Sequence, residues 1–314
     1  MTAGRFFFIA PMPRLASGGA WAAQLRRIED LGFHAVGVSE HYSHGWSMDA
    51  LTAMSFALAE TSRLHALPLV LNNDLHHPAL LAKAIATADV LSAGRAGLGI
   101  GAGWLQDDYR ALGVEYQAAP VRIARLEEAL RVIAAFFAQD RVTFSGEHYR
   151  VTELEALPRP AHSPRPPVLV GGGGRKMLDL AARYADIVGI HMRLRSSSFD
   201  ETSARELTRA RIEEKVTLVA EAAARAGRPR PELQFTCYDV NIGGSQVTPD
   251  RPDFTDYISA NPGYFADSPA SLRGDVGKCV DDLLRWNEEL GISYWNLGGD
   301  IGALAPIVAR LSGE

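Results

Sequence analysis

Val168-Leu-Val-Gly-Gly-Gly-Gly-Arg-Lys-Met177 is a short aliphatic run that passes through four glycines into a helical pattern. The run predicts a buried strand, and the spacing of Met177, Leu180 and Ala181 predicts a helix that begins at Arg175. Glycine has no Cβ, so backbone N–H groups at such a helix start can face one anion, which the helix dipole also favours. The segment therefore predicts a strand–helix unit whose turn is either an anion cradle or a plain glycine-rich turn.

The same strand-then-helix order repeats along the whole chain. Strands are predicted at residues 5–10, 35–39, 67–71, 96–100, 167–170, 187–190, 233–240 and 294–297, and helices at 20–31, 48–61, 78–91, 120–138, 175–184, 202–226, 269–290 and 302–311. Pro78 and Ser268-Pro269 are helix-start signals, and Gly32, Gly227 and Gly291 are helix-end signals. Eight units in 314 residues predict an α/β fold, a (β/α)8 TIM barrel that forms a single domain over residues 1–314. A doubly wound sheet in two lobes is the alternative.

Two segments interrupt the repeat. Asp140–Pro166 follows the fourth helix and contains an extended patch and a proline-rich run, and Asn241–Asp267 follows the seventh strand. Loops of this length in compact domains are usually functional or mobile. The barrel is therefore expected to carry insertions after helix 4 and strand 7, the second being either a substrate lid or a disordered crossover.

Composition excludes several classes of function. The net charge of −5 leaves no basic footprint for nucleic acid, and no apolar run reaches the roughly 20 residues of a membrane helix. The two cysteines, Cys237 and Cys279, lie far apart and lack metal-ligand spacing. We expect a cytoplasmic protein without a structural metal, a membrane contact or a nucleic-acid partner.

Polar residues gather where the predicted strands end, which in a barrel is the face that carries the active site. Such residues are Ser39-Glu40-His41, Asn72-Asn73-Asp74, Gly101-Ala-Gly103-Trp104 and His191. An imidazole suits proton transfer near neutral pH, so His41 is either a general base or a structural histidine. Trp104 either walls a ring-shaped ligand or packs in the core.

The fourth predicted strand has glycines at alternate positions, Gly97, Gly99, Gly101 and Gly103. Alternate residues of a strand share one face, so this face has no side chains. Glycine in a strand marks the close approach of a ligand or of another backbone. The bare face accommodates either a flat ring at the barrel mouth or large side chains from neighbouring strands.

Several of these segments together resemble the bacterial luciferase-like superfamily, over nearly the whole chain and in the same order. They are Ser39-Glu40-His41, Leu71-Asn-Asn-Asp74 with His77-Pro78, Ala88–Trp104, Arg122–Glu128, the four glycines with Ala185-Asp186, and Leu290–Tyr294. Within it, the chain is most similar to the branch of probable oxidoreductases that use the deazaflavin coenzyme F420. The resemblance implies a flavin or deazaflavin across the C-terminal mouth of a TIM barrel, and a non-prolyl cis peptide near Leu71–Asn72.

The resemblance also implies the site residues. His41 takes the place of the catalytic histidine, Asn72 or Asn73 contacts the ring, and the cofactor phosphate rests on Gly171–Arg175. The predicted cofactor-binding residues are Asn72, Asn73, Gly101, Gly103, Trp104, Asp107, Gly171, Gly172, Gly173, Gly174 and Arg175. The family's sugar-phosphate dehydrogenases have a glutamate where this chain has Trp104, which argues against that activity and favours a bulkier, less polar substrate.

Three functions follow from these expectations. The first is hydride transfer between coenzyme F420 and a small organic substrate. The second is an FMN-dependent monooxygenase that uses molecular oxygen and a partner flavin reductase, and the third is a non-catalytic flavin-binding barrel. The acidic tail of F420 suits an open groove lined by cations such as Arg175, Lys176 and Arg193, which favours the first. Relatives imply a homodimer or a higher homo-oligomer.

Overall fold

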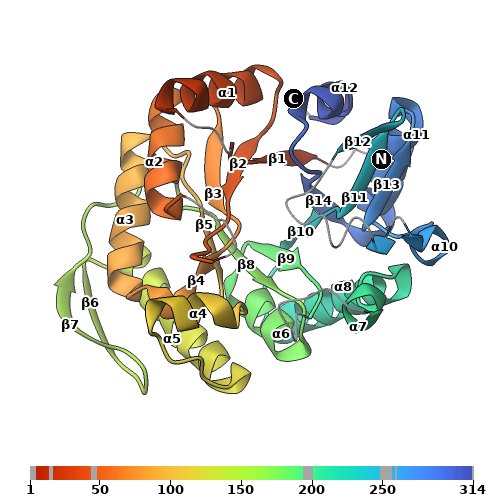
Figure 1. Cartoon of the computed structure of the whole chain (residues 1–314). Helices are drawn as coiled ribbons and strands as arrows, with labels where there is room; N and C mark the ends of the chain where they lie inside the picture. Colours follow the sequence, from red (N-terminus) through yellow and green to blue (C-terminus); the bar gives the residue numbers. More distant parts are fainter. Residues whose placement is uncertain are drawn as a thin grey trace.

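The computed structural model describes residues 5–13, 17–43, 48–193, 201–247, 257–258 and 260–312, and its central feature is a parallel sheet that curves into a barrel (Figure 1). The strand order is β3-β2-β1-β14-β10-β9-β8-β5-β4, and a parallel bridge connects Ala66 in β3 to Ala96, just before β5. These strands are β1 (Phe7–Pro11), β2 (Ala35–Val38), β3 (His65–Pro68), β4 (Leu71–Asn72), β5 (Leu98–Gly101), β8 (Val168–Gly172), β9 (Ile187–Ile190), β10 (Glu232–Thr236) and β14 (Ile292–Asn296). The short strands β3 and β4 together take the place of the third barrel strand, so the nine strands correspond to eight barrel positions. The predicted (β/α)8 barrel is confirmed.

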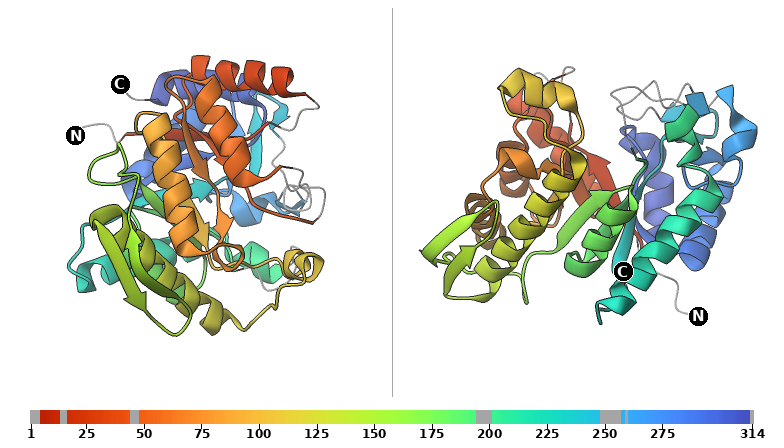
Figure 2. Two further views of the ribbon diagram at one scale, coloured as in Figure 1. Left: turned by 90° about the vertical axis from the view of Figure 1, so that its left-hand side faces the viewer. Right: turned by 90° about the horizontal axis from the view of Figure 1, so that it is seen from below.

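Helices cover the outside of this sheet, as both views in Figure 2 show. They are α1 (Gly18–Asp30), α2 (Ala50–Glu60), α3 (Pro78–Leu91), α5 (Ala119–Ala138), α6 (Arg175–Tyr184), α8 (Arg209–Arg225), α11 (Val276–Leu290) and α12 (Ile301–Leu311), with the shorter η1 (Asn73–Leu75), α4 (Gln106–Leu112), α7 (Glu201–Arg205) and α10 (Pro262–Phe265). Pro78 opens α3 as predicted. Gly32, Gly227 and Gly291 follow helix ends with φ of 83°, 63° and 76°, also as predicted.

Four sequence predictions are wrong in detail. The signal Ser268-Pro269 does not begin a helix, because β13 (Ser271–Gly274) follows it and Asp275 caps α11 instead. The predicted strand 233–240 is two strands, β10 and β11 (Asp239–Ile242), and the predicted helix 202–226 is divided into α7 and α8. The cis peptide lies between Leu69 and Val70, two residues before the predicted place.

The predicted insertion after the fourth long helix is a β-hairpin. It consists of β6 (Arg141–Ser145) and β7 (Arg150–Glu155), and it lies against α5 at the edge of the molecule (Figures 1 and 2). The Glu128 carboxylate on α5 accepts hydrogen bonds from three successive backbone N–H groups in the hairpin turn, those of residues 147–149, at 2.8 to 3.1 Å. A charged acceptor for three donors fixes the turn on α5.

The second insertion begins with β11 and continues with β12 (Ser245–Val247), which form a small sheet with β13. The fully buried Asp239 holds this sheet together, since its carboxylate accepts two hydrogen bonds from Arg273, at 2.5 and 2.8 Å. Residues 248–256 and 259 lie outside the described residues. The prediction that Asn241–Asp267 is either a lid or a crossover falls largely on them.

Two apolar layers hold the barrel. A small cluster fills its interior, made of Ile9, Ala35, Leu67, Leu169 and Ile187, with Leu69, Val70 and Tyr294 packed on it. A much larger cluster lies between strands and helices. Each fully buried Val, Leu, Ile, Phe or Met side chain contributes about 1.5–3 kcal/mol to the free energy of unfolding. In the described part of the chain, no helix is long and apolar enough to cross a membrane.

Candidate active site

Glycines at the C-terminal half of the barrel leave the mouth with a floor made of one aliphatic side chain. A Cβ on Gly101 would lie 3.1 Å from Val70 Cγ2, and one on Gly171 would lie 3.5 Å from Val70 Cγ1. Val70 is partly exposed and packs on the interior cluster. Deeper in the barrel, Gly97 and Gly99 face Leu67 and the backbone of Pro68. The glycine face of β5 therefore accommodates the neighbouring strand, and Val70 forms the surface on which a ligand in the mouth would rest.

His41 follows β2 at this mouth and is hydrogen-bonded to a buried carboxylate. His41 Nδ1 lies 2.7 Å from Asp108 Oδ2, and the His41 side chain is 15% exposed. The other carboxylate oxygen accepts from Ser43 Oγ at 2.6 Å and from the backbone N–H of Tyr42 at 3.0 Å. Burial alone would raise the pKa of Asp108, but these hydrogen bonds lower it below its usual range. Asp108 is therefore an anion that orients the imidazole of His41.

Trp104 lies beside this pair. Its ring meets the His41 ring edge to face, with centroids 5.7 Å apart and planes at 83°. Arg122, on α5, fixes the segment before α4, because its guanidinium donates hydrogen bonds to the carbonyl oxygens of Ala102 and Gly103. Tyr116 adds a hydrogen bond from its hydroxyl to the Trp104 carbonyl, at 3.1 Å. The protein thus places Trp104 and His41 together on one side of the mouth.

Glu40 points away from His41 into a second polar cluster. Its buried carboxylate accepts the backbone N–H of Asn72 at 2.7 Å and lies 2.8 Å from His76 Nε2. The Asn72 side-chain oxygen accepts from Asp74 N–H and from the hydroxyl of Tyr109. These contacts fix Asn72, at the end of β4, in one orientation.

Gly103 has room only for a hydrogen atom. Its φ is +73°, and a Cβ there would overlap the Tyr109 hydroxyl and the Asn72 side chain. Burial and the nearby Asp74 carboxylate raise the pKa of Tyr109 above its usual range, so its hydroxyl stays protonated and keeps donating. The predicted site residues Asn72 and Gly103 are therefore in contact with each other.

The four glycines lead from β8 into α6, as predicted. Gly174 is the N-cap of α6 and no side chain caps the helix. A Cβ on Gly173 would lie 2.5 Å from the carbonyl carbon of Met192, and one on Gly174 would lie 3.5 Å from Arg193 Nε. Backbone crowding therefore requires glycine at 173, and a cation lies beside the uncapped helix start.

His191, at the end of β9, faces the mouth from the opposite side. A Cβ on Gly171 would lie 3.4 Å from its ring. The buried Lys215 donates a hydrogen bond to its carbonyl oxygen at 2.8 Å and pairs with Glu206. Burial of the ring, together with Lys215, lowers the pKa of His191 to about 4, so the ring is neutral at pH 7.

Two of the predicted site residues have protein partners other than His41. Asn73 is buried and donates to the hydroxyl of Tyr149, in the turn of the hairpin, at 3.2 Å. Asp107 pairs with Arg110 along α4 at 2.9 Å. Asp108, which sequence reasoning missed, is the residue that contacts His41. Asp107 and Asp108 are adjacent in α4, and nothing in the sequence indicates which of the two faces His41.

Comparison with known proteins places the chain. The model of the luciferase-like monooxygenase family matches residues 5–241. The chain belongs to this family. The matched region includes the barrel mouth, from His41 through the four glycines to His191.

Individual relatives of this family member fall into two groups. One is an F420-dependent glucose-6-phosphate dehydrogenase of Kineococcus radiotolerans, 35% identical over 164 residues, which are 50% of this chain and 48% of the relative. Another is an FMNH2-dependent dimethylsulfone monooxygenase of Pseudomonas putida, 31% identical over 138 residues, 44% of this chain and 38% of the relative. The chain thus spans about half the length, or less, of these curated relatives.

Solved structures agree on the fold. An F420-dependent secondary alcohol dehydrogenase, in complex with an F420–acetone adduct, superposes over the whole of both chains with a TM-score of 0.76 at 19% identity. The EDTA monooxygenase of Chelativorans sp. BNC1 also gives 0.76, at 13% identity, over 98% of this chain and 94% of that one. At these identities the likeness concerns the fold alone.

Proposed function

We propose that this protein is an oxidoreductase that transfers a hydride between coenzyme F420 and a small organic substrate. The observation that carries the proposal is the His41–Asp108 pair beside the barrel mouth whose floor is Val70. Family membership, and the resemblance to curated relatives named as F420-dependent dehydrogenases, support it.

The residues present fit a phosphorylated ring cofactor. The start of α6 has backbone N–H groups without a side-chain cap, Gly173 leaves no room for a Cβ, and Arg193 lies beside Gly174. Such a helix start binds phosphate. In this proposal, Gly171–Gly174 and the backbone N–H of Arg175 hold the phosphate, while Val70, Gly101, Gly103 and Asn72 lie against the ring.

His41 exchanges the proton that accompanies hydride transfer. The deazaflavin, when bound, supplies the hydride chemistry. Because Nδ1 is hydrogen-bonded to Asp108, we assign the proton exchange to Nε2 of His41. The Asp108 carboxylate keeps the ring in one orientation, which lets a single nitrogen act as base in one direction and as acid in the other.

Trp104 shapes the substrate space next to His41. An indole offers a large apolar surface and excludes water from the reacting atoms. It stands where the family's sugar-phosphate dehydrogenases have a glutamate, so we propose a substrate that is less polar than a sugar phosphate.

The test is a titration of the purified protein with coenzyme F420 and, separately, with FMN, followed by cofactor fluorescence. Saturation by F420 in the micromolar range, with no saturation by FMN, supports the proposal and is followed by a screen of alcohols, enones and imines. Saturation by FMN alone contradicts it. In that case the FMN-dependent monooxygenase becomes the better proposal, which the similarity to the dimethylsulfone monooxygenase supports. The next step is then a search for a flavin reductase partner.

The variant His41→Ala separates an enzyme from a non-catalytic flavin-binding barrel. We expect turnover to collapse while the dissociation constant of the cofactor stays within about twofold, since His41 contacts Asp108 and Trp104 rather than the glycine cradle. Unchanged turnover would remove His41 from the mechanism.

A further inference from the structure

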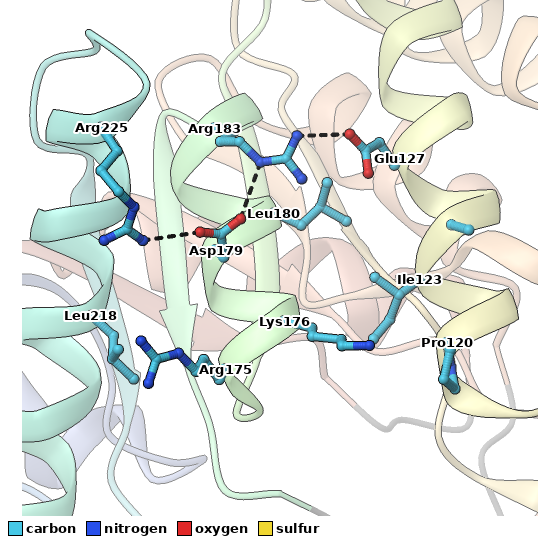
Figure 3. A pocket seen from close by; sticks show the side chains of 11 residues that line it. Pro120, Ile123, Glu127, Arg175, Lys176, Asp179, Leu180, Arg183, Leu218 and Arg225 are labelled. Carbon is cyan, nitrogen blue, oxygen red and sulfur yellow. Dashed lines mark hydrogen bonds and ion pairs between the residues drawn. The ribbon is translucent and has the colours of Figure 1, made fainter.

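A groove of about 510 Å³ crosses α6 on the outside of the barrel, between α5 and α8 (Figure 3). We call it the α6 groove. Apolar side chains from all three helices, such as Ile123, Leu180 and Leu218, form part of its lining. Its charged residues are four cations, Arg175, Lys176, Arg183 and Arg225, and two carboxylates, Glu127 and Asp179. Positive charge is therefore in excess.

The carboxylates of the groove are already paired at one end. Arg183 binds Glu127 at 2.7 Å and Asp179 at 3.2 Å, and Arg225 binds Asp179 at 3.1 Å (Figure 3). The hydrogen bond from Arg183 is the main reason that the pKa of Glu127 lies below its usual range. These four groups form a neutral network, so the excess charge belongs to the other two cations.

Arg175 and Lys176 are exposed in the first turn of α6. In Figure 3, Arg175 extends toward Leu218 on α8, and Lys176 extends toward Ile123 on α5. The two cations thus lie on both sides of the helix, at the end of the groove next to Gly174. Within the described ranges, neither forms an ion pair.

We propose that the α6 groove binds the acidic tail of coenzyme F420, with Arg175 and Lys176 contacting its glutamyl carboxylates. This inference rests on the proposed function. If the phosphate lies on Gly171–Gly174, a chain attached to it leaves the cradle at Arg175, where the groove begins. The paired network along α6 adds no net charge, so carboxylates of the tail meet attraction at the cationic end. FMN has no such tail and leaves the groove without a role.

The experiment compares two forms of the coenzyme on the wild type and on the double variant Arg175→Ala/Lys176→Ala. One form carries several glutamates, and the other has been trimmed of all glutamates but keeps its phosphate. Two exposed ion pairs are worth roughly 1 kcal/mol together at low salt, so the double variant should bind the tailed form about fivefold more weakly. Its affinity for the trimmed form should stay unchanged, and added salt should remove the difference between the proteins.

Lys83→Ala is the matched control, because Lys83 is an exposed cation on α3, far from the groove in sequence and on another helix. It should bind both forms like the wild type. Equal weakening of both forms by the double variant would overturn the inference, since the cations would then serve the phosphate. So would an unchanged affinity for the tailed form. Wild-type protein that binds FMN but neither deazaflavin would instead show that the proposed function fails, and the inference with it.

Discussion

The variant Asp108→Asn tests how His41 is held. Asparagine keeps the size of the side chain but loses the charge, and one of its two oxygens becomes an NH2 group. Asp108 is almost fully buried and accepts hydrogen bonds from His41, Ser43 and the Tyr42 N–H at 2.6 to 3.0 Å. If the amide oxygen keeps Ser43 and Tyr42, the NH2 group faces His41 Nδ1, which loses its charged acceptor. A charge-assisted hydrogen bond is worth about 1.5–3 kcal/mol, and its loss in the transition state lowers kcat roughly 10- to 150-fold.

The assay is steady-state turnover with a substrate from the screen. We expect the fall in kcat with little change in the dissociation constant of the cofactor. Ser43→Ala removes one hydrogen bond but leaves the charge, so its kcat should fall less than about fourfold. If Asp108→Asn kept the wild-type kcat, the reasoning about the pair would be refuted.

Three further predictions concern stability and the cradle. Burial lowers the pKa of His34 to about 3, so below about pH 6.5 the unfolded chain binds a proton there that the folded protein does not. The free energy of unfolding should therefore decrease as the pH is lowered, by up to roughly 1.4 kcal/mol per pH unit. Urea titrations of His34→Gln should show a smaller decrease. Gly173→Ala puts a methyl group against the backbone of Met192 and should cost about 2 kcal/mol in urea unfolding and weaken cofactor binding; unchanged binding would count against the cradle. Arg122→Gln removes charged donors to the carbonyls before α4 and should lower the free energy of unfolding by about 2 kcal/mol, whereas a change within 0.5 kcal/mol would show that the segment holds its shape without them.

Much of the fold could be predicted because strand–helix alternation is a local property of the sequence. Pro78 and Gly291 mark helix ends through their own backbone preferences, which hold in any context. The signal at Ser268-Pro269 failed because a neighbouring strand decides this segment: β13 pairs with β11, more than thirty residues earlier in sequence, and Asp239 binds Arg273 across that pair. Tertiary pairing of this kind leaves no local trace.

The site was predictable to the level of strand ends and no further. His41 stood out because it follows a strand at the expected face. Its partner Asp108 lies on a different element, 67 residues later, and only the barrel brings the two together. The role of Asn73 was equally hidden, because Tyr149 reaches it from the inserted hairpin. Contacts between an insertion and the barrel depend on how the insertion packs on the barrel. The spacing of residues along the sequence does not determine this packing.

The floor formed by Val70 has a consequence for how such a barrel changes its ligands. The Val70 side chain lies beside the space that both Gly101 and Gly171 leave open, so the depth of the mouth there depends strongly on this one position. Exchanging that residue for a smaller or larger one would deepen or raise the floor by a methyl group at a time. The surrounding backbone would keep its hydrogen bonds throughout. Laboratory selection for substrates of a different thickness should therefore reach position 70 early.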